Sequence, residues 1–468
     1  MGGAGSRAAR DRGWAAELGG DAAGDCVVWG AHVRALRLSI RFLHIAWVFF
    51  VAGLVYLGRR VAAGRIPKER VEALRGEVVA RAFERLGATF IKFGQILSTR
   101  PDVLGPGYTS TLARLQDAVP PAPFSAVQKV IAAELPPEAR RRLAFVEEAP
   151  IAAASVAQVH RARLDTGESI ALKVQRPEAE AQIERDLAIL RVMARLVDRV
   201  PSMHLMSLPG SVERFAEALH GQLDFTQEAA NNRRFAKNFE GTKDVSVPAL
   251  FPELCSKRVL GMEFIEGAKA TDPDAALGDR KKLARIGGEA ILQMVFLDGF
   301  VHADLHPGNI LLTKDDRVVL IDLGMVTEIP ADLRRPWIDT FVALSQKDER
   351  QVARLFYEYA PTVGDTMYPD YERDVAEQLA TILGKSLGEV EVGKAVSGMM
   401  NVLRRHRVQV DPSFTVVHIA LLVAEGLGKQ LDPDIDMVPL AIPYLMQALQ
   451  TAPPGRKPNR VPPRTLSS

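Results

Sequence analysis

Residues 301–324 constrain the fold of this chain more than any other stretch. Two short apolar runs, within residues 301–312 and 318–321, are separated by a turn of charged residues. Apolar runs of this length, joined by such a turn, favour β-strands in a hairpin. Each run delivers an acid to the end of a strand, Asp304 in the first and Asp322 in the second. The stretch therefore predicts two carboxylates held in place by strands.

The spacing of these acids is typical of one kind of chemistry. Asp304 and Asn309 are separated by four residues, as in the protein-kinase catalytic loop, where the Asp accepts the hydroxyl proton and the Asn holds a metal. Asp322, followed by Leu and Gly, stands where a kinase has its second metal-holding Asp. We predict a phosphoryl-transfer site that uses ATP and Mg²⁺, with Asp304 as catalytic residue and Asn309 and Asp322 as metal ligands. The alternative is a coincidental turn-rich hairpin.

Composition excludes several other classes. The 468 residues include 59 basic and 57 acidic side chains. The resulting net charge of +2 is too small to indicate nucleic acid binding from overall charge. Cys26 and Cys255 are far apart and lack metal-ligand spacing. We therefore expect a reducing compartment, without a disulfide framework or structural zinc.

A nucleotide cradle is predicted upstream. Residues 145–174 read as three antiparallel strands, with a tight loop at 151–155 and a turn at 165–167. Lys173 lies in Ala-Leu-Lys-Val, which resembles the kinase strand whose lysine binds nucleotide phosphates. Kinases place glycines in the loop so that amides approach phosphate, but here Ala152, Ala153, Ala154 and Ser155 would make it stiffer. The alternative is a plain alanine-rich turn.

Two further acids belong to the predicted nucleotide site. Glu228, on a helix predicted within residues 211–239, is the candidate partner of Lys173, because a kinase lysine is held by an acid on the adjacent helix. The other interpretation of Glu228 is a solvated helix face. Glu263 lies on a predicted strand that leads to Glu266 and Gly267, a composition that suits a hinge between lobes, so it is a candidate nucleotide-binding residue.

The N-terminal region contains an apolar segment. Residues 42–58 carry no formal charge apart from His44, and a membrane span needs about 17–25 apolar residues. A simple span with a cytosolic site would leave six arginines on the far side, contrary to the positive-inside tendency. An interfacial or re-entrant membrane helix, a true span and a buried packing helix all remain open. We expect attachment to the cytoplasmic face of a membrane.

A short helix beyond this segment carries Lys92 and Gln95. They are three residues apart and so share a face, and Gly94 beside them permits close approach of another backbone. Taken alone, the pair is typical of a solvated surface.

Together these motifs resemble the UbiB/AarF family of atypical kinases, which supports ubiquinone biosynthesis. The resemblance covers roughly residues 70–440. Its marks are Lys92-x-Gly94-Gln95, the alanine loop at 152–155, Lys173, Glu228-Ala-x-x-Asn232, His302 through Asn309, and Asp322-Leu-Gly324.

The resemblance implies an α+β fold: a protein-kinase-like two-lobed domain with an N-terminal helical extension packed over the active site. It also implies that Lys92 and Gln95 project into the nucleotide site and meet an acidic Glu-x-Asp pair. Here that triplet is Gln222-Leu-Asp224, so the first acid is an amide and only a Lys92–Asp224 contact can form. Ala303 replaces the arginine that reads a phosphorylated activation loop.

The leading hypothesis is an ATP-dependent atypical kinase or ATPase at the membrane, acting for isoprenoid-quinone biosynthesis. Its implied partners are a membrane lipid or quinone precursor and other quinone-biosynthesis proteins, whereas the alanine loop and the extension disfavour a protein substrate. One rival is a nucleotide-gated lipid-binding or chaperone module without productive turnover. Another is a small-molecule kinase of the aminoglycoside type, which has no reason to possess the extension.

These motifs divide the chain into six parts. The predicted order is a disordered leader (1–33), an apolar membrane-associated helix (34–60), the helical extension (61–140), a kinase-like N-lobe with inserted helices (141–267), a kinase-like C-lobe (268–450) and a disordered tail (451–468).

Overall fold

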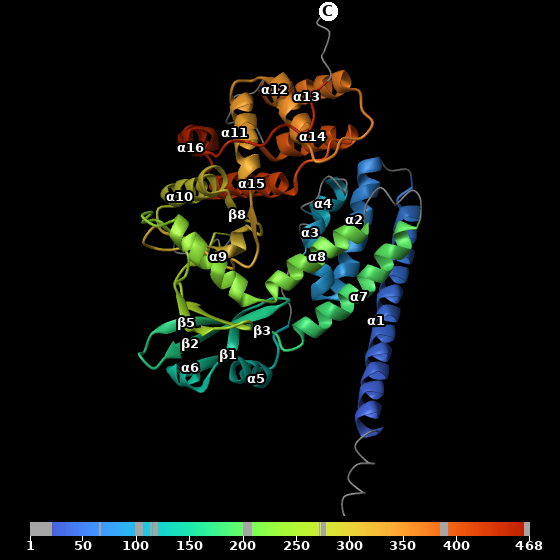
Figure 1. The fold of residues 1–468 in the computed structure, drawn as a ribbon, viewed down its shortest axis with the longest axis vertical. Coiled ribbons are helices and arrows are strands. Elements are labelled where there is room, and N and C mark those ends of the chain that lie inside the picture. Colours follow the sequence, from blue (N-terminus) through green and yellow to red (C-terminus); the bar gives the residue numbers. More distant parts are fainter. Residues whose placement is uncertain are drawn as a thin grey trace, which may run out of the picture.

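The computed structural model has two lobes, with a group of helices beside them (Figure 1). It describes residues 21–64, 67–98, 106–112, 115, 120–199, 208–270, 272, 278–383 and 392–462. Residues 264–267 connect the strand Val259–Glu263, in the sheet of the smaller lobe, to the strand Ala268–Lys269, which belongs to a sheet of the larger lobe.

The smaller lobe is built on a five-stranded antiparallel sheet. Its spatial order is β1 (Leu143–Ala153), β2 (Ala157–Leu164), β3 (Ser169–Gln175), β6 (Val259–Glu263) and β5 (Leu250–Cys255). Every residue of β3 after Ser169 is buried, since both faces of the sheet are covered. Helices α5 (Phe124–Glu134) and α6 (Pro137–Arg142) cover the outer face, and α9 (Phe225–Asn238) packs on the other.

The position of the alanine loop corrects the sequence prediction. Ala152 and Ala153 are the last residues of β1, paired with Val159 and Gln158 of β2, so the turn contains only residues 154–156. Alanine accepts extended dihedrals without strain, and the hydrogen-bonded ladder therefore continues beyond the loop start predicted at residue 151. A bond from Ala154 N–H to the carbonyl of Ala157, 2.8 Å long, closes the turn.

The larger lobe is mainly helical. The helices are α10 (Arg280–Leu292), which continues as a π-helical turn (Gln293–Asp298), α11 (Ala331–Ser345), α12 (Glu349–Tyr359), α13 (Tyr368–Leu383), α14 (Val392–Arg405), α15 (Pro412–Leu431) and α16 (Met437–Thr451). They enclose one continuous apolar core. This core holds the small sheets that carry the candidate site.

Two small sheets position the stretch that opened the sequence analysis. One has the order β4 (Val245–Ser246), β10 (Val318–Leu320), β9 (Ile310–Leu312) and β7 (Ala268–Lys269). The other pairs β8 (Phe300–His302) with β11 (Val326–Glu328). The predicted hairpin is β9–β10, and its strands are almost fully buried.

The remaining helices form a group beside the lobes. It contains α1 (Asp21–Ala62), α2 (Lys68–Leu86), α3 (Ala88–Ser98), α4 (Pro106–Leu112) and the inserted α7 (Ala179–Asp198) and α8 (Leu208–Gln222). These elements share an apolar core that includes Phe83, Leu86 and Phe90. The sequence predicted both the extension and the inserted helices.

At both ends of the chain the described residues extend into the segments predicted to be disordered. Helix α1 begins at Asp21, within the predicted leader, because no proline interrupts residues 21–62 and alanine favours helix. At the other end, Asn459 N–H donates to the carbonyl of Glu358 at 2.8 Å, and the Arg460 guanidinium lies 5.8 Å from the Tyr357 ring centroid. Residues 1–20 and 463–468 lie outside the described part of the chain.

Candidate active site

Lys173 is the centre of the site. It projects from β3 and is only 8% exposed. Its Nζ lies 2.8 Å from both carboxylate oxygens of Glu228 and 2.9 Å from Asp322 Oδ1. The sequence analysis nominated all three residues, and the structure brings them together.

The start of α9 positions Glu228. Asp224 caps this helix by accepting a 3.0 Å hydrogen bond from Thr226 N–H, which fixes the first turn. Glu228 lies one turn later, buried against the sheet. Phe225, at the first helical position, places its ring 5.4 Å from Lys173 Nζ, close enough for a cation–π contact.

Asp322 reaches Lys173 from the larger lobe. It follows β10 and has a φ of 57°, a left-handed conformation uncommon for residues other than glycine. The next residue is held by Asn231 Nδ2, which donates to the Leu323 carbonyl at 2.8 Å. The segment is therefore fixed to α9 and aims the carboxylate at the smaller lobe.

Burial and opposite charges set the protonation of this cluster. Burial raises the pKa of Glu228, and the nearby Lys173 charge only partly offsets this effect. For Asp322, whose side chain is half exposed, the surrounding protein also raises the pKa by removing part of its water, but the charge of Lys173 prevails and holds its pKa below the ordinary value. Burial lowers the pKa of Lys173, yet Asp322 and Glu228 together raise it above normal. Lys173 is thus a permanent cation here.

The loop after β8 arranges the predicted catalytic residues. His302 is buried, and burial lowers its pKa, so its neutral ring accepts from Asp304 N–H through Nδ1 at 3.2 Å. Asn309 Nδ2 donates to the Asp304 carbonyl at 3.0 Å, which closes the loop. These two bonds leave the Asp304 carboxylate partly exposed, with 34% of the side chain accessible.

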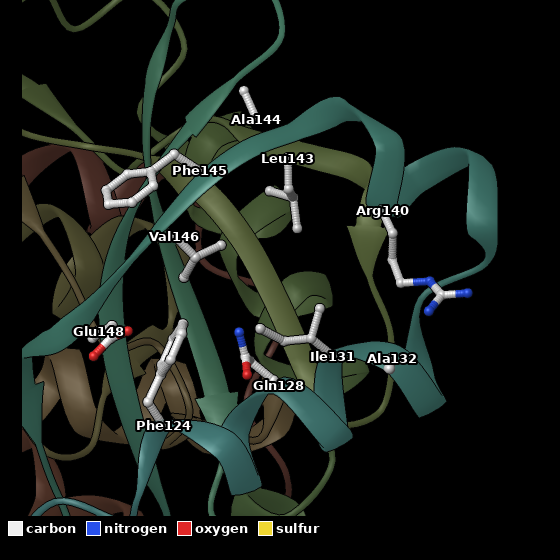
Figure 2. A pocket seen from close by; sticks show the side chains of 10 residues that line it. All are labelled: Phe124, Gln128, Ile131, Ala132, Arg140, Leu143, Ala144, Phe145, Val146 and Glu148. Atoms are coloured by element: carbon white, nitrogen blue, oxygen red, sulfur yellow. The ribbon is translucent and has the colours of Figure 1, made fainter.

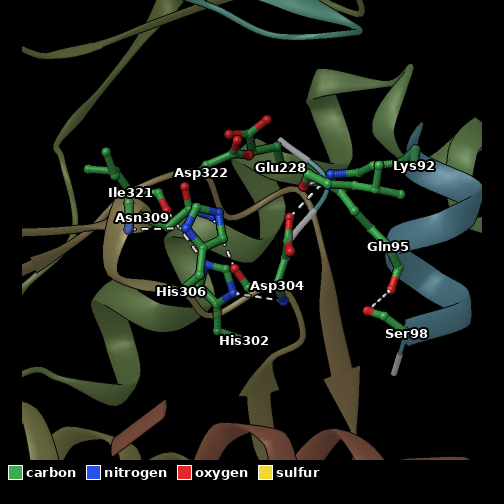
Figure 3. Close-up of polar contacts among 12 residues, drawn as sticks. Lys92, Gln95, Ser98, Glu228, His302, Asp304, His306, Asn309, Ile321 and Asp322 are labelled. Atoms are coloured by element: carbon green, nitrogen blue, oxygen red, sulfur yellow. Dashed lines mark hydrogen bonds and ion pairs between the residues drawn. The ribbon is translucent and has the colours of Figure 1, made fainter. Parts of the chain in front are cut away.

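The helical extension enters the site through Lys92. Figure 3 shows the side chain reaching from α3 to Asp304, where Nζ lies 3.2 Å from Oδ2. The sequence analysis expected a Lys92–Asp224 contact, but the Asp224 carboxylate instead accepts from Thr226 as the cap of α9. Gln95 Nε2 donates to the Leu115 carbonyl at 3.1 Å, so its amide group holds the extension together.

The remaining predicted nucleotide residues lie along the smaller lobe. Ala152 and Ala153 end β1, Ala154 begins the turn, and Ser155 is buried within it. Glu263 ends β6 at the hinge, but its Oε2 accepts from Ala249 N–H at 3.2 Å. Its carboxylate therefore helps to hold the chain just before β5 beside β6.

The donor atoms at the site fit a magnesium ion. Magnesium prefers oxygen ligands and is typically held by one or two protein groups together with phosphate oxygens. Asp322 supplies a carboxylate, and Asn309 Oδ1 accepts no hydrogen bond from any residue that the structure describes. The described residues contain no group of three or more His, Cys, Asp or Glu side chains that could hold a metal by themselves.

Sequence reasoning missed Asn231 and Phe225 as parts of the site. Asn231 lies three residues after Glu228, which places both on one side of α9, so helical spacing could have identified it. For Phe225 no such signal existed, because an aromatic residue at a helix start is commonly core.

A separate cavity of about 430 Å³ lies on the outer face of the smaller lobe, between α5, α6 and β1 (Figure 2). Leu172 and Val174 belong to the core under α5, so Lys173 between them projects to the opposite face of the sheet. The cavity is therefore distinct from the candidate active site.

Comparison with known proteins gives consistent matches. Residues 114–356 match the ABC1 atypical kinase-like domain and residues 375–436 match the UbiB helical domain. A protein named probable protein kinase UbiB from Aeromonas hydrophila is 38% identical over 380 residues, which is 79% of this chain and 70% of that protein. The protein of the same name from Pseudomonas paraeruginosa is 35% identical over 388 residues, 81% of this chain and 73% of its own length.

A solved structure supports the fold. The complex of Rv3197 with erythromycin from Mycobacterium tuberculosis superposes with a TM-score of 0.54 at 22% identity, covering 79% of this chain and 93% of that one. The two lobes, the buried lysine–acid pair and the Asp304–Asn309 loop define a protein-kinase-like fold with a helical extension over its site. Within that class, the chain belongs to the UbiB family of atypical kinase-like proteins.

Proposed function

We propose that this protein binds ATP with Mg²⁺ and catalyses phosphoryl transfer or ATP hydrolysis at a membrane, in support of isoprenoid-quinone biosynthesis. The observation that supports this most directly is the position of Lys173, whose Nζ contacts Glu228 and Asp322 within 2.9 Å. This pairing connects the two lobes across the place where a kinase holds nucleotide phosphates.

Each residue then has a defined task. Lys173, oriented by Glu228, contacts the α and β phosphates, and Asn309 and Asp322 hold the metal. The metal, when bound, neutralises charge on the phosphate oxygens. Asp304 accepts a proton from the attacking hydroxyl or positions water, and the hydrogen bond from Asn309 fixes its backbone.

The extension argues for a small acceptor. Lys92 occupies the space beside Asp304 where an incoming substrate side chain would otherwise approach. A peptide chain therefore has little access, and a lipid-linked molecule or water is the expected acceptor. The absence of an arginine before Asp304, where Ala303 stands, removes control through a phosphorylated activation loop.

Helix α1 supports attachment to a membrane. Among the described residues it alone is long and apolar enough to cross a bilayer, over Leu38–Ala62. It packs along the body, with Arg41 paired to the buried Asp186 near one end and Tyr56 accepting from Arg75 near the other. If α1 crossed the bilayer, Arg41, Asp186 and Arg75 would be carried into lipid, which costs free energy. The geometry therefore favours a helix that lies in the membrane–water interface.

ATP turnover with and without anionic vesicles tests the assignment. We expect vesicle-dependent turnover that falls at least 100-fold in Asp322→Asn, because the metal loses its carboxylate ligand. Asp315→Asn is a matched control, since Asp315 lies in the exposed β9–β10 turn and pairs only locally with Arg317. Turnover that is unchanged by vesicles and by Asp322→Asn contradicts the proposal.

A second function is favoured by the Lys92–Asp304 ion pair. The Lys92 ammonium lies 3.2 Å from Asp304 Oδ2 and so occupies one of the two carboxylate oxygens that a substrate hydroxyl or water would use. A nucleotide-gated lipid-binding module without turnover would suit this arrangement. Tight ATP binding with no product under any lipid condition favours the module, and a labelled phospho-product excludes it.

The biological role is tested in cells that lack the protein. We expect a lowered isoprenoid-quinone content that is restored by the wild-type chain and not by Asp322→Asn. A normal quinone profile in the knockout removes the biosynthetic role and leaves the nucleotide assignment unaffected.

A further inference from the structure

The cavity between α5, α6 and β1 has the size of a small-molecule site. Both helices and the strand contribute side chains to its wall (Figure 2). Its volume of about 430 Å³ lies within the range of about 300–1,000 Å³ that is usual for such sites. Because Lys173 projects to the opposite face of the sheet, the nucleotide site makes no use of this cavity.

Most of the wall is apolar. This part of it is formed by Phe124, Ile131, Leu143, Phe145 and Val146. The Phe145 side chain is 60% exposed, so a ligand lying against it would remove apolar surface from water. Figure 2 shows both phenylalanine rings at the end of the cavity farther from Arg140. Aromatic rings pack favourably against other rings in offset or edge-to-face arrangements, so this end favours a ligand with an aromatic body.

Arg140 provides a cation at the other end of the cavity, in the last turn of α6. Its Nε is buried without a hydrogen-bond partner, and no residue in the described part of the chain forms an ion pair with its guanidinium. Arg142, by contrast, is paired with Asp165 and Glu253. A guanidinium that is partly removed from water attracts an anion more strongly than a solvated one does. Its planar arrangement of donors matches a carboxylate.

The charges in the wall favour a ligand with a single negative charge. Glu148 also lines the cavity, is exposed, and lies at the end opposite Arg140 (Figure 2). A second carboxylate on the ligand would therefore be repelled by Glu148. A phosphate monoester carries a charge of about −1.5 to −2 at pH 7, which one guanidinium does not balance. The charges thus select a monocarboxylate whose anionic end points toward Arg140.

The volume of the cavity limits the size of the ligand. In a protein core, a cavity of about 150 Å³ binds one benzene molecule. A cavity of about 430 Å³ therefore accommodates about two fused rings together with a carboxylate. The compound 2-naphthoate has this composition and is a suitable probe.

We propose that this cavity binds an aromatic monocarboxylate of about two fused rings, with its carboxylate on Arg140 and its rings against Phe124 and Phe145. It is a second ligand site on the smaller lobe, separated from Lys173 by the sheet. The proposal goes beyond the proposed function and does not depend on it, because the residues that line the cavity are separate from those assigned to ATP and Mg²⁺.

Calorimetric titration of 2-naphthoate into the full-length protein in lipid nanodiscs, with empty nanodiscs as the blank, tests the site. We expect a dissociation constant below about 1 mM for the wild type and an increase of at least about tenfold in Arg140→Met, because the carboxylate loses its cation. Methionine keeps most of the side-chain volume, and the Nε that it removes has no hydrogen-bond partner in the described part of the chain.

Arg141→Met is the matched control for this titration. It removes the same charge from the neighbouring residue of α6, which is exposed and does not line the cavity. Its affinity for 2-naphthoate should equal that of the wild type. Equal affinities of the wild type and Arg140→Met, or no binding by the wild type, overturns the proposal.

The charge of the ligand provides a second test, which needs only the wild-type chain. Naphthalene-2,6-dicarboxylate keeps the two rings and adds a second carboxylate, so we expect it to bind at least about tenfold more weakly than 2-naphthoate. Glu148→Gln should reduce this difference, because it removes the repelling charge. Equal binding of both ligands by the wild type overturns the proposal. Neither titration contains a nucleotide, so failure of this inference is distinct from failure of the proposed function.

Discussion

Replacing Lys173 by methionine tests the electrostatic interpretation of the site. Lys173 and Glu228 are 8% and 5% exposed, and the ammonium lies 2.8 Å from both carboxylate oxygens. Methionine keeps most of the side-chain volume and removes the charge. The variant therefore leaves Glu228 as a buried acid without its cation, while Asp322 nearby remains negative.

The size of the effect follows from the geometry. Two unit charges 2.8 Å apart attract by about 6 kcal/mol at an effective dielectric constant of about 20. Much of this attraction only offsets the cost of burying both charges, and removing one partner of a buried pair typically costs about 3–5 kcal/mol. The Asp322 side chain is 49% exposed, so water reaches the cluster. We therefore expect Lys173→Met to lower the free energy of unfolding by an amount near the lower limit of this range, about 3 kcal/mol.

The loss should depend on pH. Burial already raises the pKa of Glu228 above 4.5 even with Lys173 present, and removing Lys173 raises it further. Between pH 4.5 and the raised pKa, the folded variant binds more protons than the unfolded chain, so its free energy of unfolding falls as pH rises. The deficit of Lys173→Met relative to wild type is therefore smaller at pH 5 than at pH 8.

Urea unfolding at both pH values measures these quantities. Glu228→Gln and the double variant with Lys173→Met complete the cycle. We expect the double variant to recover about 1–2 kcal/mol, because residue 228 is then no longer a buried charge without its cation. Two outcomes refute the reasoning: losses that simply add in the double variant, or a Lys173→Met deficit that is the same at pH 5 and pH 8.

Two further substitutions test packing. Gly94→Ala should lower the melting temperature, because the added Cβ would lie 2.4 Å from Leu115. The control Gly426→Ala should be neutral or slightly stabilising, because its Cβ would meet nothing within 4 Å. Equal melting temperatures of the two variants would contradict this expectation. Arg41→Met leaves the fully buried Asp186 without its cation. Hydrogen exchange of the backbone amides of α1 should therefore accelerate at least tenfold. Unchanged exchange would show that apolar contacts alone hold α1 against the body.

The sequence allowed the centre of the site to be predicted because its spacings are local. Asp304 and Asn309 belong to one loop, and the strand that carries Lys173 could be recognised from its apolar run. The pairing of Lys173 with Glu228 required only the general order of a kinase-like lobe. The contact of Lys92 with Asp304 was not predictable, because it joins residues 212 positions apart and depends on how α3 packs.

The ends of elements were predicted less well, for a physical reason. The last strand residues of β1 are extended because β2 offers a ladder, and alanine itself permits either strand or turn. The tail after Thr451 is ordered by carbonyl groups of α12, such as that of Glu358, which no local pattern in the tail reveals. In both places the partner lies elsewhere in the chain.

The Lys92–Asp304 contact also determines when the site can form during synthesis. Chains emerge at roughly 5–20 residues per second, so a separation of 212 residues corresponds to roughly 10–40 s between the two side chains. Once α7 and α8 have been synthesised, about two thirds of the way through this interval, the extension can fold on them while its lysine has no acid to meet. Assembly of the catalytic centre is thus a late event, and a truncated chain that ends before residue 304 has a folded extension without a functional site.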